Sequence, residues 1–224
     1  MRRAVLALAL AAQALAAAVP SPEAWFGHRM GADRKLAPWD RVVSYFQELA
    51  SASDKLTVEV LGLTTEGLPF IAATIAAPDT LRNLERYRFI QKQLADPRRT
   101  PEAEAERLIG QGKTVVMITC SIHSTEVAST QTLNPDGLEI VRRWYEKTLG
   151  TKFEGTAPPE LYHKYTGHDN NRDWYIFSQR ETRLAVSKLH NIWHPQIVYD
   201  VHQQSPFASR MFVPPWIDPI EPNI

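Results

Sequence analysis

Three residues have the chemistry and the spacing of a metal site. His123 lies three positions before Glu126 in the stretch ITCSIHSTEVAS, residues 118–129, and His202 directly follows the stretch QIVYDV, residues 196–201. A catalytic zinc ion takes three protein ligands with nitrogen or oxygen donors and keeps one position open. The H-x-x-E pair alone is equally compatible with a glutamate that opens a helix beside a partly exposed histidine. The fold must therefore bring His202 to the pair.

Two apolar runs are expected to position these residues. TVVMITC at 114–120 and QIVYDV at 196–201 have the continuous apolar character of buried strands. Ligands of open α/β sheets bind beyond the carboxyl ends of parallel strands, so we expect all three residues to meet at one sheet edge. Asp200 lies two positions before His202 and shares its face if the strand persists. We expect Asp200 to hydrogen-bond a metal ligand from outside.

Helix and strand patterns alternate along the rest of the chain. Two β-rich runs around a turn at 65–67 predict an antiparallel hairpin within residues 55–78. Residues 134–137, NPDG, predict a turn, and RMFV at 210–213 predicts a third short strand. Helical spacing or a capping pattern marks four further segments: 38–51, 79–96, 101–111 and 181–194. The alternation predicts the α/β class.

Composition excludes several classes of protein. The chain has 224 residues, of which 44% are hydrophobic, enough for one domain with a sizeable core. Lysine plus arginine equals aspartate plus glutamate at 25 each, so no net charge favours nucleic acid or an anionic membrane as a partner. Cys120 is the only cysteine, which excludes an internal disulfide and a cysteine-rich zinc module. We expect a monomer.

The N-terminus has the order of a secretory signal. Arg2 and Arg3 precede an Ala/Leu-rich run that ends in small residues before Pro20. The alternative, a membrane anchor, needs a longer apolar stretch of roughly 20 residues. We therefore expect residues 1–18 to be a signal peptide, with a mature start between Ala17 and Val19. The mature protein is expected to be secreted or periplasmic, without a membrane anchor.

Four motifs in order resemble those of one enzyme family. SIHSTEVAS, NPDG at 134–137, HDNNRDW at 168–174 and DVHQQSP at 200–206 are similar to the signature of the zinc metallocarboxypeptidases, peptidase family M14. The resemblance covers residues 36–216. It implies a three-layer α/β/α sandwich with a mixed β-sheet, and a peptidase that removes C-terminal residues from peptides and proteins.

The resemblance also implies roles for individual residues. His123, Glu126 and His202 match the ligands of one Zn²⁺ per chain, as in the His₂Glu set of carboxypeptidase A. Asn171 and Arg172 match the pair that holds the terminal carboxylate of the substrate. An arginine fork suits that task because it forms two parallel charge-assisted hydrogen bonds. Without the metal triad, the stretch NNRD would equally fit a turn held by its own side chains.

Two departures from the family pattern change the expected activity. Glu126 and His202 are only 76 residues apart, so a central strand with its helix is missing near positions 132/133. The family's general-base glutamate is expected beyond residue 224, because Glu221 has no matching motif around it. We therefore expect residues 19–224 to be a partial domain, internally deleted and C-terminally truncated, with low or no activity.

Two other functions fit the same pattern. A deacylase or a cell-wall peptide amidase could use the same zinc scaffold. A non-catalytic relic could retain zinc or peptide ends without turnover. Residue specificity is not encoded in the motifs, and the catalytic residues other than the metal ligands stay unassigned.

Overall fold

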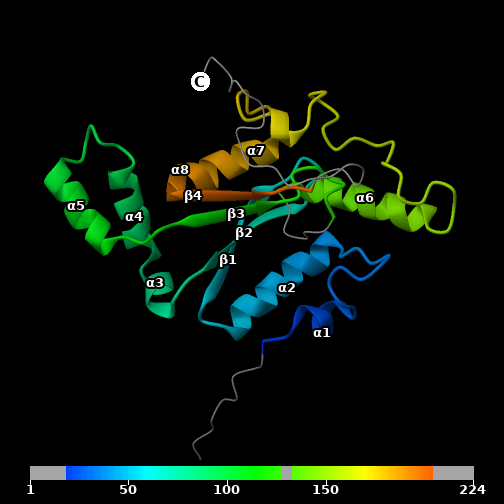
Figure 1. Ribbon diagram of the computed structural model, residues 1–224, viewed down its shortest axis with the longest axis horizontal. Coiled ribbons are helices and arrows are strands. Elements are labelled where there is room, and N and C mark those ends of the chain that lie inside the picture. The colour runs from blue at the N-terminus through cyan, green and yellow to red at the C-terminus, as the bar shows by residue number, and fades with distance from the viewer. Residues whose placement is uncertain (1–18, 128–132, 204–224) are drawn as a thin grey trace, which may run out of the picture.

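The protein combines short helices with two small β-sheets (Figure 1). The computed structural model describes residues 19–127 and 133–203. Within those ranges no helix has the length and apolar character needed to cross a membrane. The predicted signal peptide, the predicted deletion point, the strand at 210–213 and Glu221 lie outside the described residues. The elements are α1 (Pro22–Phe26), α2 (Trp39–Ala52), β1 (Leu56–Leu63), β2 (Pro69–Ile75), α3 (Pro78–Arg82), α4 (Leu84–Leu94), α5 (Glu102–Gln111), β3 (Val116–Cys120), α6 (Pro135–Thr148), η1 (Asn170–Arg172), α7 (Arg180–Leu184), η2 (Ala185–His190), α8 (Asn191–Trp193) and β4 (Ile197–Val201).

The first sheet is the predicted antiparallel hairpin. β1 and β2 pair from Leu56 opposite Ile75 to Leu63 opposite Pro69, with an irregularity between Val60 and Gly62. The turn closes through the N–H of Gly67, which donates to the carbonyl of Thr64 at 3.1 Å. Gly67 has φ 85°, a left-handed conformation that glycine adopts without strain.

The second sheet consists of β3 and β4, which pair in parallel as predicted. Cys120 lies opposite Val201, and the N–H of Ser121 donates to the Val201 carbonyl at 3.3 Å. The carboxyl ends of the two strands therefore lie side by side, where His123 and His202 follow them.

The strands of this second sheet are less buried than predicted. Ile118, Ile197 and Tyr199 are 59%, 52% and 59% exposed. Only two strands pair in this sheet within the described ranges, so their side chains are not covered on both faces. Those ranges form a mixed α/β structure with two separate two-stranded sheets rather than one larger mixed sheet.

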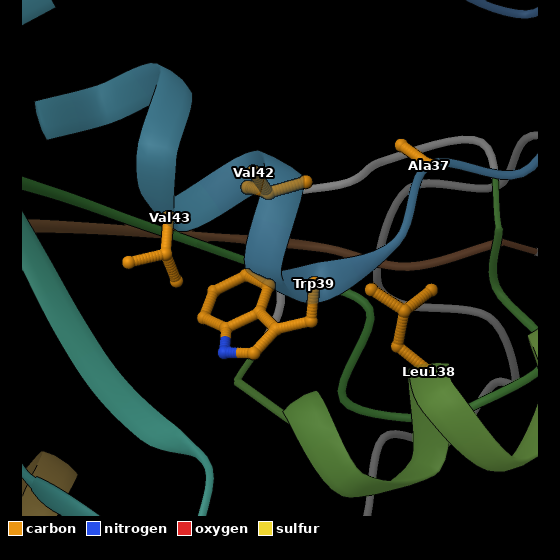
Figure 2. Close-up of a cluster of buried hydrophobic side chains, with 5 residues drawn as sticks. All are labelled: Ala37, Trp39, Val42, Val43 and Leu138. Atoms are coloured by element: carbon orange, nitrogen blue, oxygen red, sulfur yellow. The ribbon is translucent and has the colours of Figure 1, made fainter. Parts of the chain in front are cut away.

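One hydrophobic cluster joins α2 to α6 (Figure 2). It comprises Ala37, Trp39, Val42, Val43 and Leu138. The indole N–H of Trp39 donates to the carbonyl of Pro69 at 2.9 Å, and its backbone N–H donates to Glu139 Oε1 at 2.7 Å. Trp39 thus connects the helix predicted at 38–51 to the hairpin and to α6.

A second hydrophobic cluster joins the hairpin to the loop after β3 and to the start of η2. Leu61 and Phe70 of the hairpin pack with Ile122, Leu133 and Ala185. A Cβ added to Gly62 would lie 2.8 Å from Leu184 Cδ2, so α7 approaches β1 closely. The predicted helix up to Pro195 forms as α7, η2 and α8, and ends at His194, which has φ 42°.

The helical region predicted at 79–96 differs from expectation at its start. The helix begins at Pro78 rather than after Asp79, because Pro is favoured at the first helical position. Asn83 then separates α3 from α4. Of the apolar residues at the predicted face, Ile90 is buried whereas Phe89 is 58% exposed.

Candidate metal centre

The loop after β3 carries the first two ligand candidates in a tight turn rather than a helix. Ser121 has φ 50°, a left-handed conformation that is uncommon for a residue with a Cβ. Its Oγ donates to the carbonyl of Glu126 at 2.6 Å, and the N–H of Glu126 donates to the carbonyl of His123 at 3.0 Å. These two bonds close residues 121–126 into a compact loop.

The NPDG motif, residues 134–137, contacts this loop and supports it. The prediction of a turn was incomplete, because Asn134 caps α6 and Pro135 is its first residue. Asn134 Oδ1 accepts from the N–H of Gly137 at 2.9 Å, while its Nδ2 donates to the carbonyl of Ile122 at 3.1 Å. A Cβ on Gly137 would lie 2.5 Å from Ser124 Cβ, so glycine permits the close approach of α6 to the ligand loop.

His123, Glu126 and His202 come together as predicted. Glu126 Oε1 lies 2.8 Å from His123 Nδ1 and 3.2 Å from His202 Nδ1. One donor atom from each residue lies within 4.8 Å of the others, and the imidazole centroids are 5.2 Å apart. This group could hold a metal ion.

The three residues fit a divalent metal by chemistry and by burial. Donors around a tetrahedral zinc with bonds of about 2.0–2.1 Å lie about 3.3 Å apart, close to the two distances from Glu126 Oε1. Glu126 is 6% exposed, and its buried Oε2 has no hydrogen-bond partner in the described part of the chain. A buried carboxylate oxygen without a donor is costly unless a cation compensates it.

Asp200 contacts His202 as predicted. His202 Nε2 donates to Asp200 Oδ2 at 2.6 Å, and Asp200 Oδ1 accepts from the hydroxyl of Thr119 at 2.7 Å. Burial acts to lower the pKa of His202, but the hydrogen bond to Asp200 and the charges of Asp200 and Glu126 outweigh it and raise the pKa. This arrangement leaves Nδ1 as the atom that faces the other ligands.

His123 has an acidic neighbour that sequence reasoning missed. Its Nε2 lies 3.5 Å from Asp169 Oδ2 and 3.3 Å from Asn171 Nδ2. Asp169 is thus a charged neighbour of His123, at a longer distance than the 2.6 Å hydrogen bond that joins Asp200 to His202. The available signal was the position of Asp169 in HDNNRDW, two residues before Asn171.

The side chains of Asn171 and Arg172 have different surroundings in the structure. Asn171 reaches the centre through its contact with His123. Arg172 is exposed, and the hydrogen bond found for its guanidinium is to the carbonyl of Asn171 at 3.4 Å. The guanidinium forms no ion pair with any carboxylate in residues 19–127 and 133–203.

Asp173 does not pair with Arg172, although the two residues are adjacent in sequence. It is fully buried, and Oδ1 accepts from His168 Nε2 at 2.7 Å and from the N–H of Ser178 at 3.0 Å. Its Oδ2 accepts from the N–H of Gln179 at 2.9 Å. Burial opposes ionisation, but these hydrogen bonds outweigh it and lower the pKa of Asp173 to about 2.

These contacts make Asp173 the anchor of the chain between η1 and α7. They do not make a serine nucleophile. A catalytic histidine contacts serine and aspartate through different nitrogens, whereas here Nε2 of His168 faces both Ser178 and Asp173.

Comparisons with models of protein families, with curated proteins and with solved structures found no match. The inference of function therefore rests on the geometry of the centre and on the four sequence motifs.

Proposed function

We propose that this protein is a secreted zinc metallocarboxypeptidase of the M14 type, built on part of a three-layer α/β/α sandwich. The observation that carries the proposal is the convergence of His123, Glu126 and His202, whose donor atoms lie within 4.8 Å of one another. Two nitrogen donors and one carboxylate are the ligand set of catalytic zinc sites of this type. The order of the four motifs supports the same family.

Each residue then has a specific task. His123, Glu126 and His202 would hold one Zn²⁺, which when bound polarises a scissile carbonyl and activates water. Asp200 would fix the orientation of the His202 ring through its hydrogen bond, and Asp169 lies 3.5 Å from Nε2 of His123 on the other side. Asn171 and Arg172 would bind the terminal carboxylate of a peptide, with the fork of Arg172 supplying two parallel hydrogen bonds.

A second candidate is a zinc-binding protein without turnover. Three carboxylates contact the histidines of the centre: Glu126, Asp169 and Asp200. Within the described ranges no other carboxylate contacts either ring, so the centre shows no separate carboxylate to serve as a general base toward water. General-base catalysis contributes typically ~10²–10⁴-fold, so its loss would leave metal binding with little hydrolysis.

A metal titration combined with a peptide assay tests the proposal. The purified protein is expected to bind one equivalent of zinc, and to release the last residue of a free peptide more slowly than the ~1–10³ s⁻¹ typical of enzymes. A peptide with an amidated C-terminus should not react. His123→Ala should abolish both zinc binding and hydrolysis, whereas His28→Ala, a histidine away from the centre, should change neither.

The outcomes separate the candidate functions. Zinc binding with no hydrolysis favours the non-catalytic protein. Cleavage of the amidated peptide or of an acylated amino acid favours an amidase or deacylase. Failure to bind zinc at micromolar concentration contradicts all three.

A further inference from the structure

A second polar site lies in a pocket of about 280 Å³. The pocket forms where residues 162–166 meet residues 178–183, beside the turn of the β1–β2 hairpin. The three metal-ligand candidates are not among the residues that line it. Its polar wall includes Thr65, Tyr162, His163, Ser178, Arg180 and Arg183.

The two arginines of this pocket each make a long hydrogen bond to a backbone carbonyl. Arg180 Nη1 donates to the carbonyl of Thr64 at 3.5 Å, and Arg183 Nη1 donates to the carbonyl of Phe177 at 3.4 Å. Both contacts are long, and neither guanidinium forms an ion pair in the part of the chain that the structure describes. Arg142, by comparison, pairs with two glutamates at 2.7–2.8 Å.

The neighbouring carboxylates are engaged elsewhere. Glu181 Oε1 accepts from the backbone N–H of Thr65 at 2.7 Å. Asp173 accepts from two backbone N–H groups and from His168. Glu66 pairs with Lys164 at 2.5 Å. None of these three carboxylates forms an ion pair with Arg180 or Arg183 in the described part of the chain.

We propose that this pocket binds a small oxyanion, a carboxylate or phosphate group, between Arg180 and Arg183. A guanidinium presents a planar fork of donors that matches two oxygens of such a group. The buried Nδ1 of His163 has no hydrogen-bond partner within the described ranges and adds a polar group that a ligand could satisfy. The volume suits an ion or a small acid, since drug-sized ligands occupy about 300–1,000 Å³.

Anion titration tests this site independently of the proposed peptidase function. Inorganic phosphate and acetate are titrated separately by calorimetry, at constant ionic strength set with chloride. At least one should bind saturably, and the Arg180→Gln/Arg183→Gln protein should bind roughly tenfold or more weakly, because charge-assisted hydrogen bonds are lost. Arg29→Gln, which removes an exposed arginine outside the pocket, should leave the affinity unchanged.

Each possible result has a defined meaning. A stronger response to phosphate assigns a phosphorylated ligand, and a stronger response to acetate assigns a carboxylic acid. Equal affinity with and without EDTA places the anion away from the metal centre. Binding that disappears with EDTA, that never saturates, or that weakens equally in the Arg29→Gln control would overturn the proposal. If the double variant fails to fold by circular dichroism, Arg183→Gln alone provides the same comparison, because Arg183 is exposed.

Discussion

At the residue scale, the centre combines one buried anion with two partly exposed rings. The side chain of Glu126 is 7% exposed, whereas those of His123 and His202 are each 34% exposed. The carboxylate is thus the ligand most isolated from water, and the rings form the accessible side of the centre. A cation bound here would compensate the buried charge and remain reachable from solvent.

Removal of the charge of Glu126 should weaken zinc binding without lowering the stability of the metal-free protein. Glu126→Gln is expected to weaken zinc binding by roughly 10²-fold or more, because a charged ligand is replaced by a poor neutral one. The metal-free variant should unfold at the same temperature as the metal-free parent or higher, because the buried Oε2, which has no hydrogen-bond partner in the described ranges, no longer belongs to a charged group. Chelator-competition titration and thermal unfolding measure the two quantities. Glu85→Gln, at a side chain that is 85% exposed, is the matched control.

Asp200, which hydrogen-bonds His202, should increase the affinity of the centre for zinc although it is not a metal ligand. Asp200→Asn is expected to lower zinc affinity by about 10–100-fold, because Nε2 loses its charged acceptor and the ring loses its fixed orientation. The stoichiometry of one zinc should persist. Competition titration against the parent and against Asp33→Asn, at a side chain that is 97% exposed, measures the effect. An unchanged affinity would show that Asp200 does not orient the ring.

At the element scale, the ligand loop depends on contacts between segments. β3 and β4 place the two histidines at one sheet edge, and α6 supports the loop through Asn134 and Gly137. The chain from η1 to α7 is fixed by Asp173, which lies close in sequence to Asn171. Substitutions at these supporting residues should therefore alter the geometry of the metal centre, although none of them is a metal ligand.

Gly137 offers a direct test of helix-to-loop packing. Gly137→Ala should destabilise the protein by about 1–3 kcal/mol, because its Cβ would overlap Ser124 and Asn134. The displaced loop should also bind zinc more weakly. Gly110→Ala is the matched control, since a Cβ there meets nothing within 4 Å and alanine is the better helix former. Urea unfolding should show the control unchanged or stabilised.

The Asp173 anchor should make stability fall in acid. Its folded-state pKa of about 2 is below the ordinary value of 3.8, so the carboxylate stabilises the fold above about pH 4. That contribution, on the order of 1–2 kcal/mol, should be lost as pH falls from about 4 to about 2. Urea unfolding across this window should show a shallower pH dependence in Asp173→Asn and no change of slope in Asp33→Asn. Equal slopes in parent and Asp173→Asn would contradict the anchor.

At the scale of the whole molecule, the metal would connect distant parts of the chain. Glu126 and His202 are 76 residues apart in sequence, and the sheet that joins them has only two strands in the described ranges. The exposed side chains of β3 and β4 show that this sheet gains little stability from burial. A shared ion would hold the two strand ends together.

Zinc should therefore raise the stability of the whole protein. At a free zinc concentration 100 times the dissociation constant, the expected gain is about 2.7 kcal/mol. Thermal unfolding should shift upward with zinc in the parent and not in a His123→Ala/His202→Ala variant. An equal shift in both proteins would place the stabilising ion elsewhere.

Much of the fold and the ligand set was determined by local sequence. Apolar periodicity and turn chemistry predicted the hairpin, the two strands of the parallel pair and four helical segments, because these patterns act between residues that are near neighbours. They missed the helix α6, of which only the first residues were predicted, as a turn. Since His123 and His202 directly follow two such strands, their convergence with Glu126 could be predicted as well.

The tertiary structure decided what depends on contacts between remote segments. The partners of Asp173, the exposure of β3 and β4, and the two pocket arginines that form no ion pair in the described ranges carry no local signal. A carboxylate takes whichever donors the fold brings within about 3 Å, and a strand is buried only if other elements cover it. Those outcomes are properties of the assembled structure, and the sequence near each residue does not specify them.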